Sequence, residues 1–139
     1  MANLKRCFKC KAEFIPSSVH HLFCSARCCA SYNAGKSWDA FFKKLIQKSV
    51  ERKDLTVADL VKILEEQNGL CALSGVTLTR ITGHGNISTN ASIDRINAGG
   101  PYTIDNIRLV CSCINSFRGN LNDEEFKFWC KRVANNGSV

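Results

Sequence analysis

SIDRINAGGPYTIDNIRLVCSCINSFR, residues 92–118, is the stretch that decides the fold of this chain. Apolar and polar residues alternate near its two ends, which predicts short strands over 91–96 and 107–110. The glycine- and proline-containing run between them predicts a loop. Asn115 and Arg118 are three residues apart, so they share a face if the segment after the second strand is helical. The stretch therefore predicts two strands followed by a helix.

Two oxygen-bearing side chains in this stretch are candidate metal ligands. Asp94 ends the first strand and Asn115 lies on the following helix. A carboxylate and a carboxamide in these places can converge on one hard cation. A ligand set this small leaves sites open to water and phosphate, which suits Mg²⁺ or Mn²⁺.

The motifs SIDRI, YTIDNIRLVC and N-x-x-R make residues 55–134 resemble the HNH (ββα-metal) endonuclease family. Within it, the chain is similar to the phage-type subgroup whose first motif is Asp-Arg instead of Asp-His. The resemblance implies that Asp94 and Asn115 bind a catalytic Mg²⁺ or Mn²⁺. It also implies that Asn106 pins the loop between the strands.

Arg95 stands where most of these enzymes have a histidine that activates water. An arginine stays protonated in proteins, so Arg95 cannot be a general base, but its planar guanidinium can clamp the scissile phosphate. His84, in a polar loop leading to the first strand, is the candidate base, because histidine protonates near neutral pH. The alternative for His84 is an ordinary surface residue. Tyr102 is also a candidate base, but its preferred role is to pack the loop.

The positive charge indicates where a polyanion would bind. Residues 1–50 hold nine Lys and Arg against two acids, which gives +7, whereas residues 51–139 hold ten of each. This asymmetry favours nucleic acid as the partner of the first part of the chain, over a basic surface that only aids solubility. The candidate DNA contacts are Arg95, Arg118, Arg108, Lys43 and Lys44.

Cys7 and Cys10 form a C-x2-C pair, and Cys24 and Cys28 form a second short-spaced pair. Two such pairs supply the four ligands of a structural zinc, with no position left open for chemistry. The pattern is similar to a treble-clef-type finger, with a hairpin expected over 13–23. Three residues are alternative ligands: Cys29, His20 and His21.

Three helices are expected outside this motif. Residues 38–50 show a basic amphipathic pattern, and Thr56 with Asp59 predicts a capped helix as far as Gln67. Asn122 predicts the start of a last helix, whose apolar stripe is Phe126, Trp129, Cys130 and Val133. The expected organisation is α+β: a four-cysteine zinc finger over 1–35, a basic helix and linker over 36–54, and a nuclease domain over 55–139.

Family members often carry a second zinc on two further C-x2-C pairs. Here Ser74 and Ile114 replace two of those cysteines, which leaves Cys71, Cys111 and the off-register Cys113. Apolar packing is expected in place of the metal, since a buried cysteine behaves as a small hydrophobe. A site rescued by Cys113 or Cys130 is the alternative.

The leading hypothesis is a metal-dependent DNA endonuclease of the HNH type. The alternatives are a non-catalytic zinc-dependent DNA-binding protein on the same scaffold, and a structural or protein-interaction finger. Double-strand cleavage by a fold with one site would favour a homodimer. No run approaches the roughly 18 apolar residues of a membrane span. With no secretion signal, nine cysteines point to metal sites or reduced thiols and to the cytoplasm of a bacterial or phage-infected cell.

Overall fold

The computed structural model describes residues 3–18, 21–33, 37–82 and 85–137. These residues form a mixed α+β fold with five α-helices and two small antiparallel sheets. The chain divides into two compact units, an N-terminal unit of Met1–Trp38 and a C-terminal unit of Asp39–Val139. Residues 39–54, expected as a separate basic helix and linker, belong to the C-terminal unit. Among the described residues, no helix combines the length and the apolar character needed to cross a membrane.

The N-terminal unit is built around a cysteine turn between two short strands. β1 (Lys5–Arg6) pairs antiparallel with β2 (Glu13–Phe14), and α1 (Ala26–Asn33) follows. The backbone N–H of Cys7 bonds the Ala12 carbonyl at 2.9 Å, and Lys11 turns the chain at a φ of 64°. These contacts close the hairpin around the first cysteine pair. The expected hairpin over 13–23 was therefore placed too late in the sequence.

The centre of the C-terminal unit is the predicted strand pair and helix. β3 (Ala91–Arg95) and β4 (Ile107–Cys111) pair antiparallel, with Ile93 opposite Leu109 and Asp94 opposite Arg108. α4 (Ser112–Arg118) follows β4 directly, and α5 (Asp123–Asn136) comes next. The predicted order of two strands and a helix is confirmed, with bounds that differ by one or two residues.

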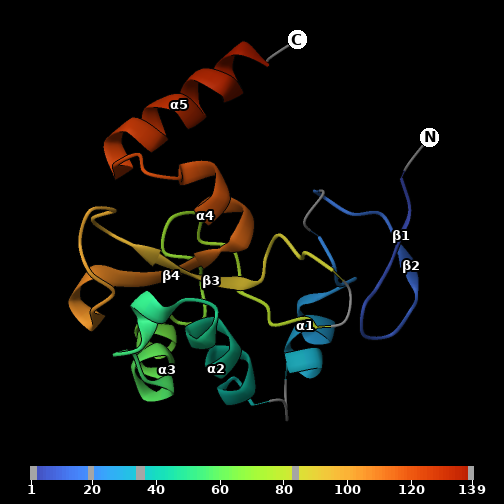
Figure 1. The fold of residues 1–139 in the computed structure, drawn as a ribbon. Helices are drawn as coiled ribbons and strands as arrows, with labels where there is room; N and C mark the ends of the chain where they lie inside the picture. The colour runs from blue at the N-terminus through green and yellow to red at the C-terminus, as the bar shows by residue number, and fades with distance from the viewer. Residues whose placement is uncertain (1–2, 19–20, 34–36, 83–84, 138–139) are drawn as a thin grey trace. The chain divides into compact units, whose positions relative to one another are not determined.

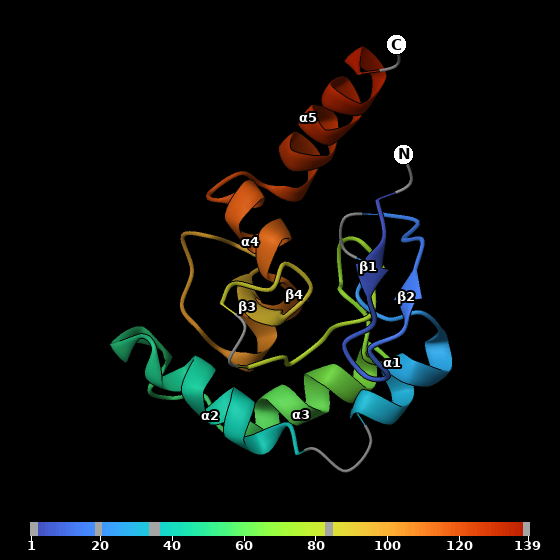
Figure 2. The same cartoon turned by 90° about the vertical axis from the view of Figure 1, so that its right-hand side faces the viewer.

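Two helices cover one side of this sheet. α2 (Asp39–Gln47) and α3 (Val57–Glu66), joined through a 3-10 turn at Val50–Arg52, lie on the side opposite α4 in both views (Figures 1 and 2). The core consists of apolar residues from these helices and both strands, among them Phe42, Leu45, Leu60, Ile63, Ile93 and Leu109. This packing holds β3 and the start of α4 in place.

Helix starts match their sequence signals. The N–H of Asp59 bonds Thr56 Oγ1 at 3.2 Å, and Asp59 Oδ2 accepts the N–H of Thr56 at 2.8 Å. Asn122 and Glu125 form the same reciprocal box at the start of α5. Such boxes satisfy N–H groups that a helix leaves without intrahelical partners. The two predicted helix starts are confirmed.

Gln67 joins the end of α3 to the outer edge of β4. Its Nε2 donates to the Leu109 carbonyl at 2.8 Å and its Oε1 accepts the Leu109 N–H at 3.0 Å. The side-chain amide thus pairs with the strand as a neighbouring backbone would. The Ala72 N–H adds a 3.0 Å bond to the same carbonyl.

Candidate functional site

The four cysteines predicted to bind zinc lie together in the N-terminal unit. The sulfurs of Cys7, Cys10, Cys24 and Cys28 all lie within 4.8 Å of one another. Cys24 Sγ is 3.6 Å from both Cys10 Sγ and Cys28 Sγ. A tetrahedral zinc with Zn–S bonds of about 2.3 Å separates its sulfurs by about 3.8 Å. The cluster is therefore compatible with a structural zinc site.

Ionisation of the cluster is uneven. Burial opposes ionisation of Cys7, but backbone N–H groups of Cys10, Cys24 and Lys9 lower its pKa to about 6. Hydrogen bonds with Cys10, Cys28 and Cys7 raise the pKa of Cys24 to about 12. The lowered pKa of Cys7 favours its thiolate, which is the form that binds metal.

The alternative zinc ligands considered from the sequence are not part of the four-cysteine cluster in the described residues. Cys29 is next to Cys28 on α1 but is not part of the cluster, and burial raises its pKa. His21 Nδ1 accepts the Ser17 N–H at 3.1 Å, and its ring packs against Phe14. His20 lies outside the described residues.

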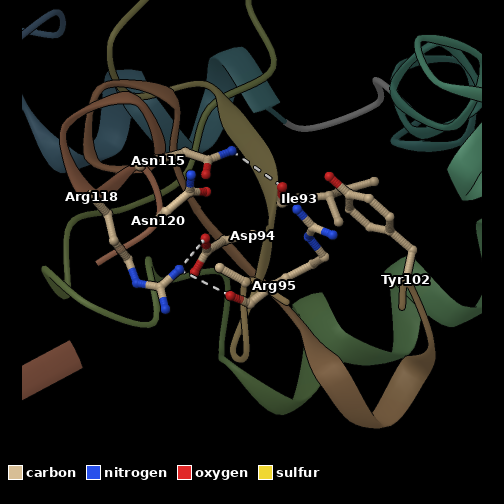
Figure 3. Close-up of a pocket in the computed structure, with 9 residues that line it drawn as sticks. Ile93, Asp94, Arg95, Tyr102, Asn115, Arg118 and Asn120 are labelled. Carbon is tan, nitrogen blue, oxygen red and sulfur yellow. Dashed lines mark hydrogen bonds and ion pairs between the residues drawn. The ribbon is translucent and has the colours of Figure 1, made fainter. Parts of the chain in front are cut away.

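A hollow of about 70 Å³, the polar pocket, lies where β3 meets α4 (Figure 3). Its lining combines residues of β3, of the following loop and of α4 with its C-terminal extension: Ile93, Asp94, Arg95, Ala98, Tyr102, Asn115, Arg118, Gly119 and Asn120. Five residues singled out from the sequence thus line one pocket: Asp94, Arg95, Asn115, Arg118 and Tyr102.

Asp94 is held by two arginines inside the fold. Its carboxyl group is 3% exposed, and it accepts Arg108 Nε on Oδ2 and Arg118 Nη1 on Oδ1, both at 2.9 Å. Asp123 of α5 closes the set, since it accepts from Arg108 at 2.6 and 2.7 Å and from Arg118 Nε at 3.2 Å. We call these four residues the Arg–Asp network. It ties β3, β4, α4 and α5 together with a net charge of zero.

Arg118 and Arg108 are structural residues in this arrangement. The Arg118 side chain is 1% exposed, and its remaining bonds run to the carbonyl oxygens of Arg95 and Ile96 at 2.9 and 2.8 Å. Arg108 is 13% exposed and engaged by two carboxylates. Carboxylates of the network hold both guanidinium groups, so a DNA phosphate would have to compete with these ion pairs for either arginine. The arrangement therefore favours a structural role over the predicted contacts with DNA.

Asp123 makes the network sensitive to acid. The hydrogen bond from Arg108 lowers the pKa of Asp123 from 3.8 to about 2. A folded-state pKa below the unfolded value stabilises the fold above about pH 4, and this stabilisation is lost as pH falls toward 2. With 33% of the side chain exposed, we expect Asp123→Asn to cost about 1 kcal/mol at pH 7. Urea unfolding at pH 7, 4 and 2.5 should show the difference from wild type shrinking with acidity.

The exposed neighbour Glu124→Gln is the matched control for this prediction, because it removes a charge from the same helical turn without touching the network. An Asp123→Asn deficit that is constant from pH 7 to 2.5 would contradict the assignment.

Asn106 holds the loop between the strands, as the sequence resemblance implied. Its Oδ1 accepts the Asn97 N–H at 3.0 Å, and its Nδ2 donates to the carbonyls of Asn97 and Pro101. Gly100 is required beside it, since an added Cβ would lie 2.7 Å from Asn106 Nδ2. Asn106 is therefore a positioning residue and does not line the pocket.

Arg95 is held over the loop that Asn106 shapes. Its guanidinium carbon lies 4.8 Å from the centre of the Tyr102 ring, and Nη1 donates to the Gly100 carbonyl at 3.1 Å. Arg52 contacts the same ring at 5.0 Å. Cation–π contacts of this kind fix the direction of a guanidinium and leave part of it available to a ligand. Tyr102 therefore packs the loop, which is the role that the sequence analysis preferred over that of a general base.

The orientation of Asn115 follows from its partners. Nδ2 donates to Ser92 Oγ at 2.7 Å and to the Ile93 carbonyl at 3.1 Å. A carbonyl can only accept, so the nitrogen must face β3, and the amide oxygen is left for a ligand. Asn115 lies on the helix after the second strand, as predicted, but the anchoring role of Ser92 was missed.

Asn120 is a pocket residue that the sequence analysis overlooked. Gly119 ends α4 with a φ of 54° and turns the chain so that Asn120 lines the pocket. Within the described parts of the chain, its amide makes no hydrogen bond. The signal was present in the sequence, because Gly-Asn directly after a helix predicts a tight turn that can aim a polar side chain.

A second hollow, the lysine groove, runs between α2 and the start of β3. It has a volume of about 470 Å³ and is lined by Lys44 and Lys48 together with apolar and small polar residues, including Ser92. Ser92 thus lines this groove and bonds Asn115 of the polar pocket. Lys43, predicted with Lys44 to contact DNA, is exposed but is not in the lining. His84, the candidate base, lies outside the described residues.

The remaining cysteines of the broken second motif pack in the core of the C-terminal unit. Cys71 and Cys111 are each 2% exposed. Cys71 Sγ accepts the N–H groups of Cys111 and Ser74 at 3.2 and 3.4 Å. Cys113 is half-buried and Cys130 is exposed on α5.

No family model, curated protein or solved structure matches this chain.

Proposed function

We propose that this chain is a metal-dependent DNA endonuclease of the HNH type, with a structural zinc in its N-terminal unit. The observation that carries the proposal is the polar pocket, which gathers Asp94, Arg95 and Asn115 from a strand–strand–helix unit. Their order along the chain matches the SIDRI and N-x-x-R motifs. A carboxylate, a carboxamide oxygen and a guanidinium in one pocket suit phosphodiester chemistry.

The donor set fits a hard divalent cation. Each Asp94 oxygen uses one lone pair on an arginine and keeps another, and the Asn115 oxygen faces away from its donor bonds. These two residues would hold Mg²⁺ or Mn²⁺, which when bound supplies Lewis-acid stabilisation of the charge on the phosphate and the leaving 3′ oxygen. The charged residues in and beside the pocket carry a net charge of +1: Arg95, Arg108 and Arg118 against Asp94 and Asp123. Ion binding is therefore expected to strengthen when a DNA phosphate is present.

The other residues position the substrate. Arg95, held by Tyr102 and Gly100, is placed to bind the scissile phosphate through the donors that the loop leaves available. Asn120 adds an amide at the same pocket that can bond a phosphate oxygen or a water. An arginine cannot take the proton of the attacking water, so His84 stays the candidate base.

Plasmid cleavage tests the proposal, with zinc-loaded protein in Mg²⁺, Mn²⁺ or EDTA. We expect metal-dependent nicking or linearisation, lowered about 100-fold or more in Asn115→Ala, which removes a proposed metal ligand. Ser92→Ala is the matched control: it removes the same Asn115–Ser92 bond but keeps the Asn115 oxygen, so its loss should be about tenfold, the low end for a residue that orients a ligand. His84→Ala, run in parallel, tests whether that loop supplies the base.

A binding-only protein on the same scaffold is the second candidate. It is favoured by the two arginines on Asp94, which already neutralise the carboxylate in the absence of any cation. Wild-type protein that shifts DNA in a gel but cuts it under none of the metals would establish this candidate and overturn the nuclease.

The lysine groove is proposed to carry the DNA strand toward the pocket. We expect Lys44→Gln/Lys48→Gln to lower the slope of log affinity against log salt by about 0.9 per lost phosphate contact, or about 1.8 in all. Fluorescence anisotropy with a labelled duplex over a range of salt concentrations measures this slope.

Lys43→Gln removes the same charge from the same helix outside the groove, and its slope should match wild type. An equal drop in slope for Lys43→Gln and Lys44→Gln would show that the groove has no special part in binding.

A further inference from the structure

α5 presents a large apolar surface that the C-terminal unit does not cover. The helix extends away from the sheet beyond α4 (Figures 1 and 2). Of the apolar stripe predicted from the sequence, Phe126 is buried, but Trp129 is 56% and Val133 72% exposed, and Cys130 is exposed as well. Phe128, also 56% exposed, contacts the Trp129 ring edge-on at 5.3 Å. Exposed patches of this kind mark interaction sites.

The charges of α5 indicate what kind of partner fits. The first turn is acidic, with Asp123, Glu124 and Glu125, and the basic residues come later, at Lys127, Lys131 and Arg132. Asp123 is neutralised within the Arg–Asp network. The other charges of the helix are two acids near its start and three basic residues farther along. A second copy of α5 running in the opposite direction places its basic half against the acidic first turn, whereas a parallel copy would set like charges together.

We propose that two copies of this chain pair through α5 in an antiparallel arrangement. Glu125 and Arg132 are seven residues apart and immediately precede Phe126 and Val133, so they flank the apolar stripe on one side. In an antiparallel pair, Glu125 of each copy meets Arg132 of the other, because a two-fold axis repeats every contact. The pairing buries Trp129 and Val133 and forms this ion pair twice.

The midpoint of the helix makes the arrangement checkable. α5 runs from Asp123 to Asn136, so its central residues are Trp129 and Cys130. The pairing of Glu125 with Arg132 puts the two-fold axis one residue before this midpoint, between Phe128 and Trp129, and each Cys130 then lies near its counterpart. A short bismaleimide should link two full-length chains through this thiol.

The experiment compares full-length, zinc-loaded protein with two variants by sedimentation over about 1–100 µM, the range in which so small an interface dissociates. We expect wild type to dimerise as concentration rises and Trp129→Glu to stay monomeric. Phe117→Glu is the matched control, since Phe117 is 71% exposed but lies on α4. Wild type that is monomeric throughout, or equal losses in the two variants, overturns the proposal.

Two further measurements fix the direction of pairing. Cross-linking should give a covalent dimer that Cys130→Ser abolishes. Arg132→Gln should weaken the dimer several-fold, and so should Glu125→Gln, which keeps a side chain able to close the capping box with Asn122. The double variant should be no weaker than either single one, because both changes remove the same ion pair, which forms only between antiparallel helices. Losses that add up in the double variant overturn the antiparallel arrangement. If Cys130 of a monomeric protein is protected from the bismaleimide, another surface covers α5. Such protection, whether by the N-terminal unit or by added DNA, overturns pairing through α5.

Discussion

Removing zinc with a chelator is expected to unfold residues 3–33 and to leave residues 39–137 folded. The N-terminal unit has two strands of two residues, one eight-residue helix, and only Cys7 and Phe23 as buried hydrophobic residues in its described part. A core this small cannot offset the entropy of ordering the chain. Structural zinc contributes about 10–16 kcal/mol in comparable fingers, so its loss removes most of what holds this unit together.

Heteronuclear NMR with measured zinc content checks this expectation. Cys10→Ser should lose the metal and the dispersed amide signals of the N-terminal unit, while those of the C-terminal unit persist. Cys29→Ser is the matched control, because Cys29 is the neighbour of a cluster cysteine but lies outside the cluster. A chelated protein whose N-terminal signals stay dispersed would refute the zinc assignment.

The second large effect is expected at Arg118, the most completely buried charged residue described. Arg118→Met keeps much of the side-chain volume but leaves Asp94 paired with Arg108 alone. It also removes the donor to the carbonyl oxygens of Arg95 and Ile96. Breaking a buried ion pair from one side costs about 3–5 kcal/mol. We therefore expect the free energy of unfolding of the C-terminal unit to fall by that amount in urea denaturation followed by circular dichroism.

Arg95→Met provides the comparison for Arg118→Met. Arg95 is next to Asp94 in the sequence, but its side chain is half-buried and bonds one loop carbonyl. Its loss should cost about 1 kcal/mol or less, in line with a single hydrogen bond and one cation–π contact. A cost for Arg118→Met no larger than that for Arg95→Met would mean that the Arg–Asp network does not hold the fold.

The strands and helices could be predicted because their signals are local. Alternation placed β3 and β4, and the Thr56 and Asn122 caps placed the starts of α3 and α5, since each of these signals needs only a few neighbouring residues. The cysteine pairs were equally readable, because ligand spacing is a property of one turn.

The roles of the arginines could not be predicted from the same signals. Composition rules place Arg118 and Arg108 on the surface, since charged residues are buried only when paired. Their partner Asp123 lies on α5, and only the fold shows that this helix returns its first turn to the sheet. Likewise, the apolar periodicity of α5 predicted a helix correctly but could not say whether the stripe faces the core or another molecule.

Gln67 has a consequence for solubility. A two-stranded sheet has two open edges, and an open edge is a template on which another chain can add a strand and begin to aggregate. The side-chain amide of Gln67 pairs with the backbone of Leu109 and so occupies the edge of β4 at this position. One side chain thus does here what a third strand would otherwise do. The end of α3 thus shields the sheet against unwanted self-assembly.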